Sequence, residues 1–350
     1  MTGVDPESLH GQAMLRVRDL RVTFRTVSGP VRAVNGVNFE LDRGEILALV
    51  GESGSGKTVS SLSLTRLLPR NAEVEGEVLL DGRDILKASN SALREVRRNR
   101  VAYVFQDPIS SLNPARRVGS QLVELLRVNR GMRSNEARNR ARELLSHVGI
   151  PGESRYMRAY PHELSGGMCQ RVMIAMALAT EPEIIVADEA TSALDVSIQA
   201  QILELLQRLR DQFDTAMVVV THDFGVVAGI ADRVAVMYGG EIIEIGATEV
   251  VLSNPEHPYT AALMMSAPDS SDEATTELFM IPGTLEESRE HAGSRCQFSP
   301  RCPLAFDRCW SEWPKLKDRQ SGHAAACHLD GEEVAAWLDS GGEITVSRPA

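Results

Sequence analysis

Apolar and polar residues alternate over the first part of the chain. Between Leu15 and Glu40, apolar side chains recur at about every second position on both sides of a polar turn at residues 28–30. Because successive side chains of a strand point to opposite faces, this alternation predicts antiparallel strands with one buried face. We therefore expect a small β-rich region at the start of the chain.

Three later segments are short and almost wholly apolar. They are residues 46–50, 184–187 and 217–220, and a helical pattern over 198–209 separates the last two. Continuous apolar runs of this length are typical of parallel strands that are buried on both faces. A further strand is expected at 101–105. The pattern therefore predicts an α/β core around a parallel sheet.

Helical spacing replaces strand spacing over about residues 112–165. Ser134 is placed as an N-cap, apolar residues then recur at helical intervals, and Gly149 ends the pattern. Beyond about residue 252, prolines and polar residues become frequent. We therefore predict a helical insertion in the α/β core, followed by a separate C-terminal region.

The composition is that of a globular protein, with 350 residues of which 43% are hydrophobic and 24% charged. No apolar segment approaches the roughly 20 residues that a membrane-spanning helix needs, and the N-terminus lacks a basic-then-apolar export signal. The formal net charge of −11 argues against a protein that binds nucleic-acid phosphates, since such domains usually carry a basic surface. We expect a cytosolic chain that reaches a membrane only through a protein partner.

A glycine-rich segment follows the apolar run at 46–50 and precedes a helical pattern. Its sequence, GESGSGKT, matches G-x-x-x-x-G-K-[ST], in which backbone N–H groups surround phosphate groups. Lys57 is placed to reach the β- and γ-phosphates of a nucleotide, and the Thr58 hydroxyl is placed to bind Mg²⁺. The residues expected to line this cradle are Gly51, Ser53, Gly54, Ser55, Gly56, Lys57 and Thr58. The segment therefore predicts nucleotide binding.

Four further motifs follow along the chain. LSGGMCQR at 164–171 opens a helix with a serine and two glycines, which makes a second candidate anion site. The next apolar run ends in Asp188, placed to hold Mg²⁺, and Glu189, placed to orient or deprotonate a water molecule. SALD follows at 192–195, and THD at 221–223 ends the last apolar run. An acid pair together with a phosphate cradle predicts hydrolysis of a nucleoside triphosphate.

Together with the glutamine of VFQDP, these motifs resemble those of the ATP-binding subunits of ABC transporters, over roughly residues 15–265. The resemblance implies an α/β fold with a P-loop, RecA-like ABC ATPase core, an antiparallel β-subdomain and an inserted helical subdomain. It also implies ATP and Mg²⁺ as cofactors. On this basis we divide the chain into an N-terminal tail (1–14), an ATPase domain (15–252), a Cys-containing C-terminal extension (253–330) and a C-terminal tail (331–350).

The resemblance also implies roles for single residues. Phe24 would stack on the adenine, and Gln106 would contact Mg²⁺ and the attacking water. Asp188 would bind Mg²⁺ with Thr58, Glu189 would be the general base, and His222 would donate a hydrogen bond to the γ-phosphate. The list of expected catalytic residues is Glu189, His222 and Gln106.

In the family that the chain resembles, the LSGG segment closes over a nucleotide held by a partner subunit. Ser165, Gly166 and Gly167 would act in this way, and Asp195 belongs to the expected nucleotide-binding residues. The implied partners are a second ABC ATPase subunit, more often a paralogue than a second copy, two transmembrane permease subunits and an extracytoplasmic substrate-binding protein. No nucleic acid is expected. The chain would lie at the cytoplasmic face of the inner membrane as a peripheral subunit.

The region after residue 252 resembles the extension of dipeptide and oligopeptide permease ATPases, through residues 254–260, 281–283 and 296–303. Four of the five cysteines fall here, separated by five, six and seventeen residues: Cys296, Cys302, Cys309 and Cys327. In a cytosolic protein such a cluster indicates metal or redox chemistry rather than structural disulfides. Zinc sites usually show tighter pairs, whereas an iron–sulfur cluster tolerates looser spacing. Members of the resembling subfamily carry a [4Fe–4S] cluster at such cysteines, which favours that cofactor here; zinc, free thiols or a disulfide remain alternatives.

The function that follows is an ATPase subunit that powers import of dipeptides or oligopeptides through a membrane ABC importer. An importer of nickel or of another small solute is an alternative, because such importers use similar subunits. A soluble ABC ATPase that acts on nucleic acid or the ribosome is disfavoured by the single nucleotide domain, the absence of a heptad run and the acidic charge. A regulatory module that binds ATP without hydrolysing it is disfavoured by the presence of Glu189 and His222.

Overall fold

The computed structural model describes residues 13–150, 153–191, 194–266, 280–284, 294–320 and 322–341. The first two residues of SALD and most of the expected N-terminal tail therefore lie outside the described residues. The strands are β1 (Leu15–Thr26), β2 (Gly29–Leu41), β3 (Ile46–Val50), β4 (Ala72–Leu80), β5 (Arg83–Asp84), β6 (Val101–Val104), β7 (Ile184–Asp188), β8 (Ala216–Thr221), β9 (Arg233–Tyr238), β10 (Glu241–Ala247), β11 (Lys317–Gln320) and β12 (His323–Ala325).

Helices separate most of these strands. They are α1 (Lys57–Ser63), α2 (Asn90–Asn99), α3 (Pro108–Ser111), α4 (Val118–Arg130), α5 (Ser134–His147), α6 (Glu153–Tyr156), the 3₁₀ helix η2 (Pro161–Glu163), α7 (Gly166–Leu178), α8 (Val196–Phe213), α9 (Phe224–Ile230), α10 (Thr248–Ser253), α11 (Pro258–Met265), α13 (Asp307–Ser311) and α14 (Gly331–Asp339). Among the described residues, no helix combines the length and the apolar character that crossing a membrane requires.

The described strands form two sheets. The smaller sheet has the order β2-β1-β4-β5 and is antiparallel, as the alternation in the first part of the chain predicts. The larger sheet has the order β11-β12-β10-β9-β3-β8-β7-β6, and its neighbours from β9 to β6 are parallel. The wholly apolar runs form β3, β7 and β8, which are buried along their lengths because helices or the smaller sheet cover both faces.

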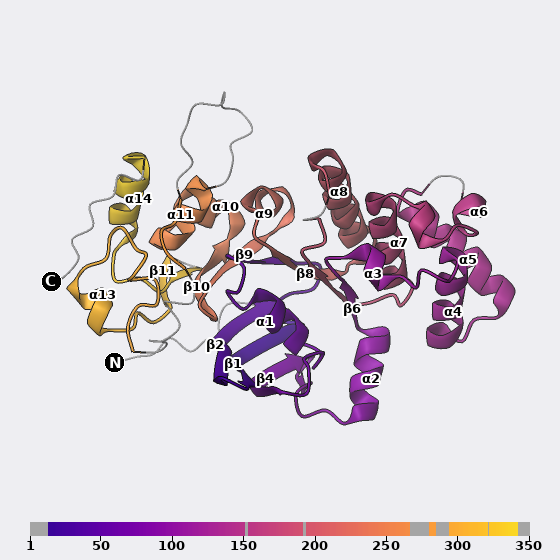
Figure 1. The fold of residues 1–350 in the computed structure, drawn as a ribbon, viewed down its shortest axis with the longest axis horizontal. Helices are drawn as coiled ribbons and strands as arrows, with labels where there is room; N and C mark the ends of the chain where they lie inside the picture. Colours follow the sequence, from indigo (N-terminus) through magenta and orange to yellow (C-terminus); the bar gives the residue numbers. More distant parts are fainter. Residues whose placement is uncertain are drawn as a thin grey trace.

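Figure 1 shows three regions around the parallel strands. The smaller sheet, with β1, β2 and β4, lies below them, α4 to α7 lie at one end, and α11, α13, α14 and β11 lie at the opposite end. The helical region is the insertion that the sequence predicts, and the α/β core agrees with the expected fold class.

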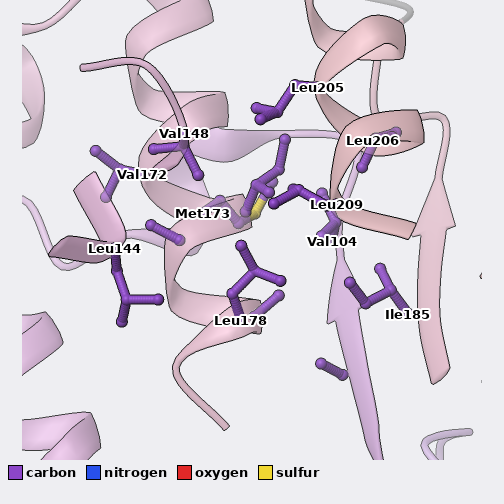
Figure 2. Packing of buried hydrophobic residues seen from close by; sticks show 14 of the residues in the cluster. Val104, Leu144, Val148, Val172, Met173, Leu178, Ile185, Leu205, Leu206 and Leu209 are labelled. Atoms are coloured by element: carbon purple, nitrogen blue, oxygen red, sulfur yellow. The ribbon is translucent and has the colours of Figure 1, made fainter. Parts of the chain in front are cut away.

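The core of the helical end is packed between helices and the sheet. Figure 2 shows side chains of α7 and α8 in contact with residues of β6 and β7. Met173, Leu178, Leu206, Val104 and Ile185 all belong to this buried cluster. Burial of such side chains stabilises each by about 1.5–3 kcal/mol relative to exposure. The packing therefore fixes α7, which begins with the LSGG segment, against the strand that carries the acid pair.

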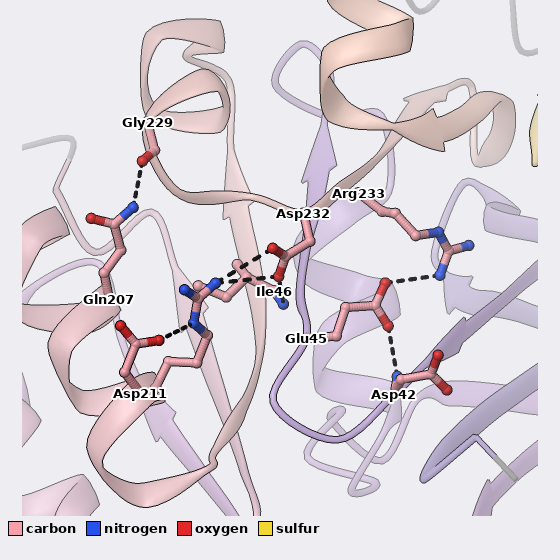
Figure 3. A network of polar contacts seen from close by, with 9 residues as sticks. Asp42, Glu45, Ile46, Gln207, Asp211, Gly229, Asp232 and Arg233 are labelled. Carbon is pink, nitrogen blue, oxygen red and sulfur yellow. Dashed lines mark hydrogen bonds and ion pairs between the residues drawn. The ribbon is translucent and has the colours of Figure 1, made fainter. Parts of the chain in front are cut away.

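Polar contacts fix the start of β3. The Ile46 N–H donates to the Asp232 carboxylate at 2.8 Å, and the Glu45 carboxylate accepts from the Asp42 N–H at 2.6 Å and from Arg233 at 2.9 Å (Figure 3). These contacts join the strand to the link between α9 and β9. These contacts hold the start of β3 in place. The glycine-rich segment begins at the opposite end of the same strand, so its position in the fold is fixed as well.

The C-terminal region contributes two strands and a helix that pack against the rest of the chain. Strands β11 and β12 form a hairpin that continues the larger sheet, with Ala325 opposite Glu244 of β10. Helix α14 occupies part of the segment that was expected to be a C-terminal tail, because Asp330 and Glu333 form a capping box and Val334 and Trp337 pack into an apolar cluster. The sequence analysis predicted neither the hairpin nor α14, although the Asp330–Glu333 spacing is a local signal for the start of a helix.

Candidate active site

The glycine-rich segment forms a tight loop between β3 and α1. Gly54 and Gly56 have φ angles of +84° and +105°, which side-chain-bearing residues rarely adopt. A Cβ atom on Gly51 would lie 2.2 Å from the carbonyl oxygen of Met237, and one on Gly56 would lie 2.7 Å from the carbonyl oxygen of Ala33. The glycines are therefore required both by the conformation of this phosphate loop and by its close contact with neighbouring strands.

Lys57 lies folded over the loop. Its Nζ donates hydrogen bonds to the carbonyl oxygens of Gly51, at 2.6 Å, and Glu52, at 2.9 Å. Burial lowers the pKa of Lys57, while the charges of Glu189, Asp188 and Glu52 act in the opposite direction. The ammonium group is thus surrounded by loop carbonyls and acids, where a phosphate oxygen could replace a carbonyl as its partner.

Thr58 and Asp188 face each other across the site. The Thr58 hydroxyl donates to the Asp188 carboxylate at 3.0 Å, and only 7% of Asp188 is exposed. Burial raises the pKa of Asp188 and the charge of Glu189 raises it further, whereas the hydrogen bond from Thr58 and the charge of Lys57 lower it. Hydroxyl and carboxylate oxygens are the ligands that Mg²⁺ prefers, and a divalent cation would offset the cost of this buried carboxylate. These two residues therefore fit the expected Mg²⁺ site.

Glu189 has an unusual backbone conformation directly after β7. Its φ angle is +46°, which costs a residue with a side chain about 1–2 kcal/mol, and its N–H donates to the Val220 carbonyl at 2.9 Å. The conformation turns the chain sharply at the carboxyl end of the strand. Strained residues of this kind are frequent at active sites.

The three expected catalytic residues lie together, with Gln106 and His222 both at the Glu189 carboxylate. Gln106 Nε2 donates to Oε2 at 2.9 Å, and His222 Nδ1 lies 3.4 Å from Oε1. Gln106 follows β6, Glu189 follows β7 and His222 follows β8, and these three strands are parallel neighbours. Because the carboxyl ends of parallel strands meet at one edge of a sheet, residues 83 and 33 positions from Glu189 become its neighbours.

The other expected nucleotide-binding residues lie on different elements. Ser165 is the N-cap of α7 and accepts from the Met168 N–H at 3.3 Å. Asp195 is the N-cap of α8 and accepts from the Ile198 N–H at 3.0 Å; this bond and one from the Ser197 hydroxyl lower the pKa of Asp195. Their described contacts are therefore within their own helices rather than with the phosphate loop.

Gly167 and Phe24 are also placed by the structure. Gly167 is buried in α7, and Phe24 of β1 is partly buried against the apolar cluster of the smaller sheet. Neither has a described contact that tests a role in nucleotide binding.

The sequence analysis assigned no role to Glu52 of the phosphate loop or to its two partners, Arg301 and Tyr259. Arg301 donates to the Glu52 carboxylate at 2.7 and 3.0 Å, and the Tyr259 hydroxyl accepts from the Glu52 N–H at 2.8 Å. Glu52 lies inside the glycine-rich segment, whereas its partners lie 207 and 249 residues away. No sequence pattern relates positions so far apart.

The four C-terminal cysteines are free of disulfides, and the Cys296 N–H donates to the Cys309 carbonyl at 3.1 Å. Burial raises the pKa of Cys296 to about 12 and that of Cys327 to about 11, and neighbouring cysteines contribute to both shifts. In the part of the chain that the structure describes, no group of three or more His, Cys, Asp or Glu side chains is arranged to hold a metal ion. The expected iron–sulfur cluster is therefore not supported by the side-chain geometry.

Two protein families match this chain. The family described as "ABC transporter" matches residues 34–192, and the family described as "Oligopeptide/dipeptide transporter, C-terminal region" matches residues 243–309. The first range contains the phosphate loop and Glu189, and the second contains three of the four C-terminal cysteines.

Curated relatives match over most of the chain. The oligopeptide transport ATP-binding protein of Salmonella typhimurium is 44% identical over 321 residues, which cover 92% of this chain and 95% of the relative. One of the same description from Bacillus subtilis is 48% identical over 273 residues, which cover 77% of this chain and 76% of the relative.

Solved structures match the core. The dimeric structure of a bacterial ABC transporter cassette has a TM-score of 0.61 and 31% identity, and it covers 67% of this chain and 99% of its own. The same cassette in a post-hydrolysis state, bound to ADP and Pi, matches equally well. The chain therefore belongs to the ABC transporter family, as an ATP-hydrolysing, ATP-binding subunit of the oligopeptide/dipeptide group.

Proposed function

We propose that this chain hydrolyses ATP to power the import of peptides through a membrane complex. The observation that carries the proposal is the Glu189 carboxylate, which lies between the Gln106 amide and the His222 ring beside the phosphate loop. The oligopeptide transport relatives and the C-terminal region support peptides as the cargo.

Each residue of the site has a proposed task. The loop residues and Lys57 would bind the triphosphate, and Thr58, Asp188 and Gln106 would hold Mg²⁺, which would neutralise phosphate charge when bound. Glu189 accepts a proton from the attacking water, and the Gln106 contact orients its carboxylate. Phe24 stacks on the adenine.

His222 contacts Glu189 from the neighbouring strand end and donates to the γ-phosphate when ATP is present. The ring is more than half exposed, so it is free to turn toward a bound nucleotide. After hydrolysis and release of the γ-phosphate, the His222 ring would lose this hydrogen bond and keep its contact with Glu189.

A second ATPase subunit completes the site. Ser165, Gly166 and Gly167 begin α7 at the helical end of the molecule, away from α1 (Figure 1), so a facing subunit is needed to bring such a segment to the γ-phosphate. The match to a dimeric cassette supports this arrangement. The partner is proposed to be a paralogue, with a second copy of this chain as the other outcome of the test.

The complete complex contains two transmembrane permease subunits and an extracytoplasmic substrate-binding protein, and the chain lies at the cytoplasmic face of the inner membrane. ATP binding closes the two ATPase subunits and hydrolysis separates them, which moves the attached permeases.

The test uses the purified chain with its partner subunits and compares wild type with Glu189→Gln. We expect the variant to bind ATP and to form a stable ATPase dimer, measured by light scattering, while phosphate release is lost. Glu249→Gln is a matched control, since Glu249 is an exposed acid on α10, and it should hydrolyse ATP at the wild-type rate. ATP binding without turnover in the wild type would overturn the proposal in favour of a regulatory module.

Cargo is tested separately in cells that lack this subunit. Restored uptake of labelled di- or oligopeptides supports peptide import. Restored uptake of nickel, with no effect on peptides, would assign the chain to a nickel importer.

The four C-terminal cysteines are proposed to bind a [4Fe–4S] cluster, which would cross-link a segment with a small core of its own. The proposal rests on four disulfide-free thiols that fall within 32 residues of the C-terminal region, at positions 296–327. Because the described side-chain positions do not bring three of these thiols together, cluster binding would have to reposition them. Iron and sulfide analysis together with the visible absorption spectrum tests it, and Cys302→Ser should abolish the absorption. Colourless protein with stoichiometric zinc, or with no metal, would overturn it.

A further inference from the structure

Two side chains of the C-terminal region form hydrogen bonds with Glu52, the second residue of the phosphate loop. The Arg301 guanidinium donates two hydrogen bonds to the Glu52 carboxylate, at 2.7 and 3.0 Å, and the Tyr259 hydroxyl accepts from the Glu52 N–H at 2.8 Å. Lys57 in addition donates to the Glu52 carbonyl oxygen at 2.9 Å. The carboxylate, N–H and carbonyl of Glu52 each therefore have a described partner.

A carboxylate in a phosphate-binding loop is electrostatically unfavourable for the ligand. Burial lowers the pKa of Lys57, and the charge of Glu52 is one of three acidic charges that oppose this shift. The same negative charge would repel the triphosphate that the loop binds. Only 26% of the Glu52 side chain is exposed, so solvent screens this charge only in part. Arg301, only 4% exposed, neutralises it through a bidentate ion pair.

Arg301 is itself held rigidly. Its Nε donates to the Pro282 carbonyl at 2.7 Å, and its guanidinium lies 5.8 Å from the centre of the Tyr238 ring. Burial alone would lower the pKa of Arg301, but the hydrogen bonds to Glu52 and Tyr238 raise it above its usual value. The guanidinium is therefore a fixed positive charge and not a mobile surface group.

The support for Arg301 comes from the cysteine-bearing segment and from aromatic packing. Its N–H donates to the Phe298 carbonyl at 2.9 Å, and Cys302 follows it directly. The ring of Phe298 packs edge-on against those of Tyr238 and Tyr259, with centres 5.2 and 5.3 Å away. The same small cluster thus positions both side chains that contact Glu52.

We propose that Arg301 is a positioning residue for ATP binding: it cancels the charge of Glu52 and fixes the phosphate loop, so that the C-terminal region is a functional part of the nucleotide site. This inference rests on the proposed function only in that the loop binds ATP. It assigns the C-terminal region a task in the ATPase core itself.

The experiment measures the Kd of Mg-ATP for the full-length chain by calorimetry. Arg301→Ala should raise the Kd about tenfold, the size of coupling usual for residues in one ion-pair network. Glu52→Gln should not weaken binding, because it removes a repulsive charge. The double variant Glu52→Gln with Arg301→Ala should bind ATP more tightly than Arg301→Ala alone, within about threefold of wild type.

Arg308→Ala is the matched control. Arg308 pairs with Glu312 within the same C-terminal region, at 2.7 Å, and has no described contact with the loop. Its removal should leave the Kd unchanged. Thermal unfolding confirms that each variant is folded. Arg301→Lys keeps the charge but not the bidentate geometry, so it should raise the Kd above the wild-type value by less than about tenfold, and it tests the inference even if Arg301→Ala does not fold.

Three results overturn the inference: a wild-type Kd in folded Arg301→Ala, a Kd in the double variant as high as in Arg301→Ala, or an increase in Kd for Arg308→Ala equal to that for Arg301→Ala. The second result is expected if Arg301 only stabilises the fold, and the third is expected if loss of any ion pair in the C-terminal region weakens ATP binding. Failure of the wild-type chain to bind Mg-ATP would instead overturn the proposed function.

Discussion

The Thr58 hydroxyl donates a hydrogen bond of 3.0 Å to the Asp188 carboxylate, although the two residues are 130 positions apart. The bond joins the end of the phosphate loop to the carboxyl end of β7. Two oxygen groups of the kind that Mg²⁺ prefers therefore lie beside the loop, and the proposed site needs the hydroxyl to exchange the carboxylate for the ion as its partner.

Replacing Thr58 with valine removes this hydroxyl but keeps the shape of the side chain. We expect the Mg²⁺ concentration that gives half-maximal ATPase activity to rise by about tenfold or more, because one ligand is lost. Thr58→Ser retains the hydroxyl and should stay close to wild type. Equal Mg²⁺ dependence in the valine and serine variants would contradict the assigned site.

The second prediction concerns the contacts of the Glu189 carboxylate. His222→Ala and Gln106→Ala should each lower kcat by about 100-fold, the usual contribution of a positioned group in proton transfer and charge stabilisation. Each variant also loses one proposed contact with Mg-ATP, but the Kd should change less than kcat, because the phosphate loop and Lys57 keep most of the contacts with the triphosphate. Phosphate release and calorimetry measure the two effects, and a loss confined to ATP binding would contradict these roles.

A third prediction separates two adjacent glycines in α7. A Cβ atom on Gly167 would lie 2.7 Å from Cγ2 of Ile198, whereas one on Gly166 would lie 3.7 Å from the nearest atom, Cδ2 of Leu194. Gly167→Ala should therefore lower the free energy of unfolding by about 1–3 kcal/mol, because α7 and α8 must move apart. Gly166→Ala should cost little. Urea unfolding of the two variants gives the comparison, and equal stabilities would show that the helices adjust without cost.

The fourth prediction is a pH dependence that arises from His257. Burial, with a smaller contribution from Arg319, lowers the pKa of His257 from 6.5 to about 3, and its Nδ1 accepts a hydrogen bond from the Tyr259 N–H at 3.0 Å. The unfolded chain therefore binds a proton at this ring between those two values while the folded chain does not. Stability from this group is complete above pH 6.5 and is lost as the pH falls toward 3.

Between about pH 7 and about pH 5, this single group should lower the free energy of unfolding by about 2 kcal/mol. His257→Asn keeps a side-chain acceptor at the N-cap of α11 but cannot be protonated. Its free energy of unfolding should fall less steeply over the same interval in urea unfolding experiments. Parallel pH profiles for the two proteins would show that His257 does not cause the dependence.

Much of the fold could be predicted from local patterns. The alternation in β1 and β2 and the apolar runs of β3, β7 and β8 indicate their burial directly, because each pattern lies within one short segment. The hairpin of β11 and β12 was missed, since it includes polar positions such as 317–320 and depends on pairing with β10. Helix α14 was also missed, although Asp330 three residues before Glu333 is a local helix-start signal; which side of the helix is buried depends on its contact with α11.

The sequence by itself determined the chemistry of the nucleotide site, because glycine spacing, Lys57, Thr58 and the acid pair at 188–189 lie in contiguous motifs whose residue types are required by phosphate and Mg²⁺. The tertiary structure alone decided which distant groups act on one another. Parallel strand order brings Gln106 and His222 to Glu189, and the folded C-terminal region brings Arg301 to Glu52. Contacts of this kind depend on packing between segments up to 249 residues apart, where local propensity carries no information.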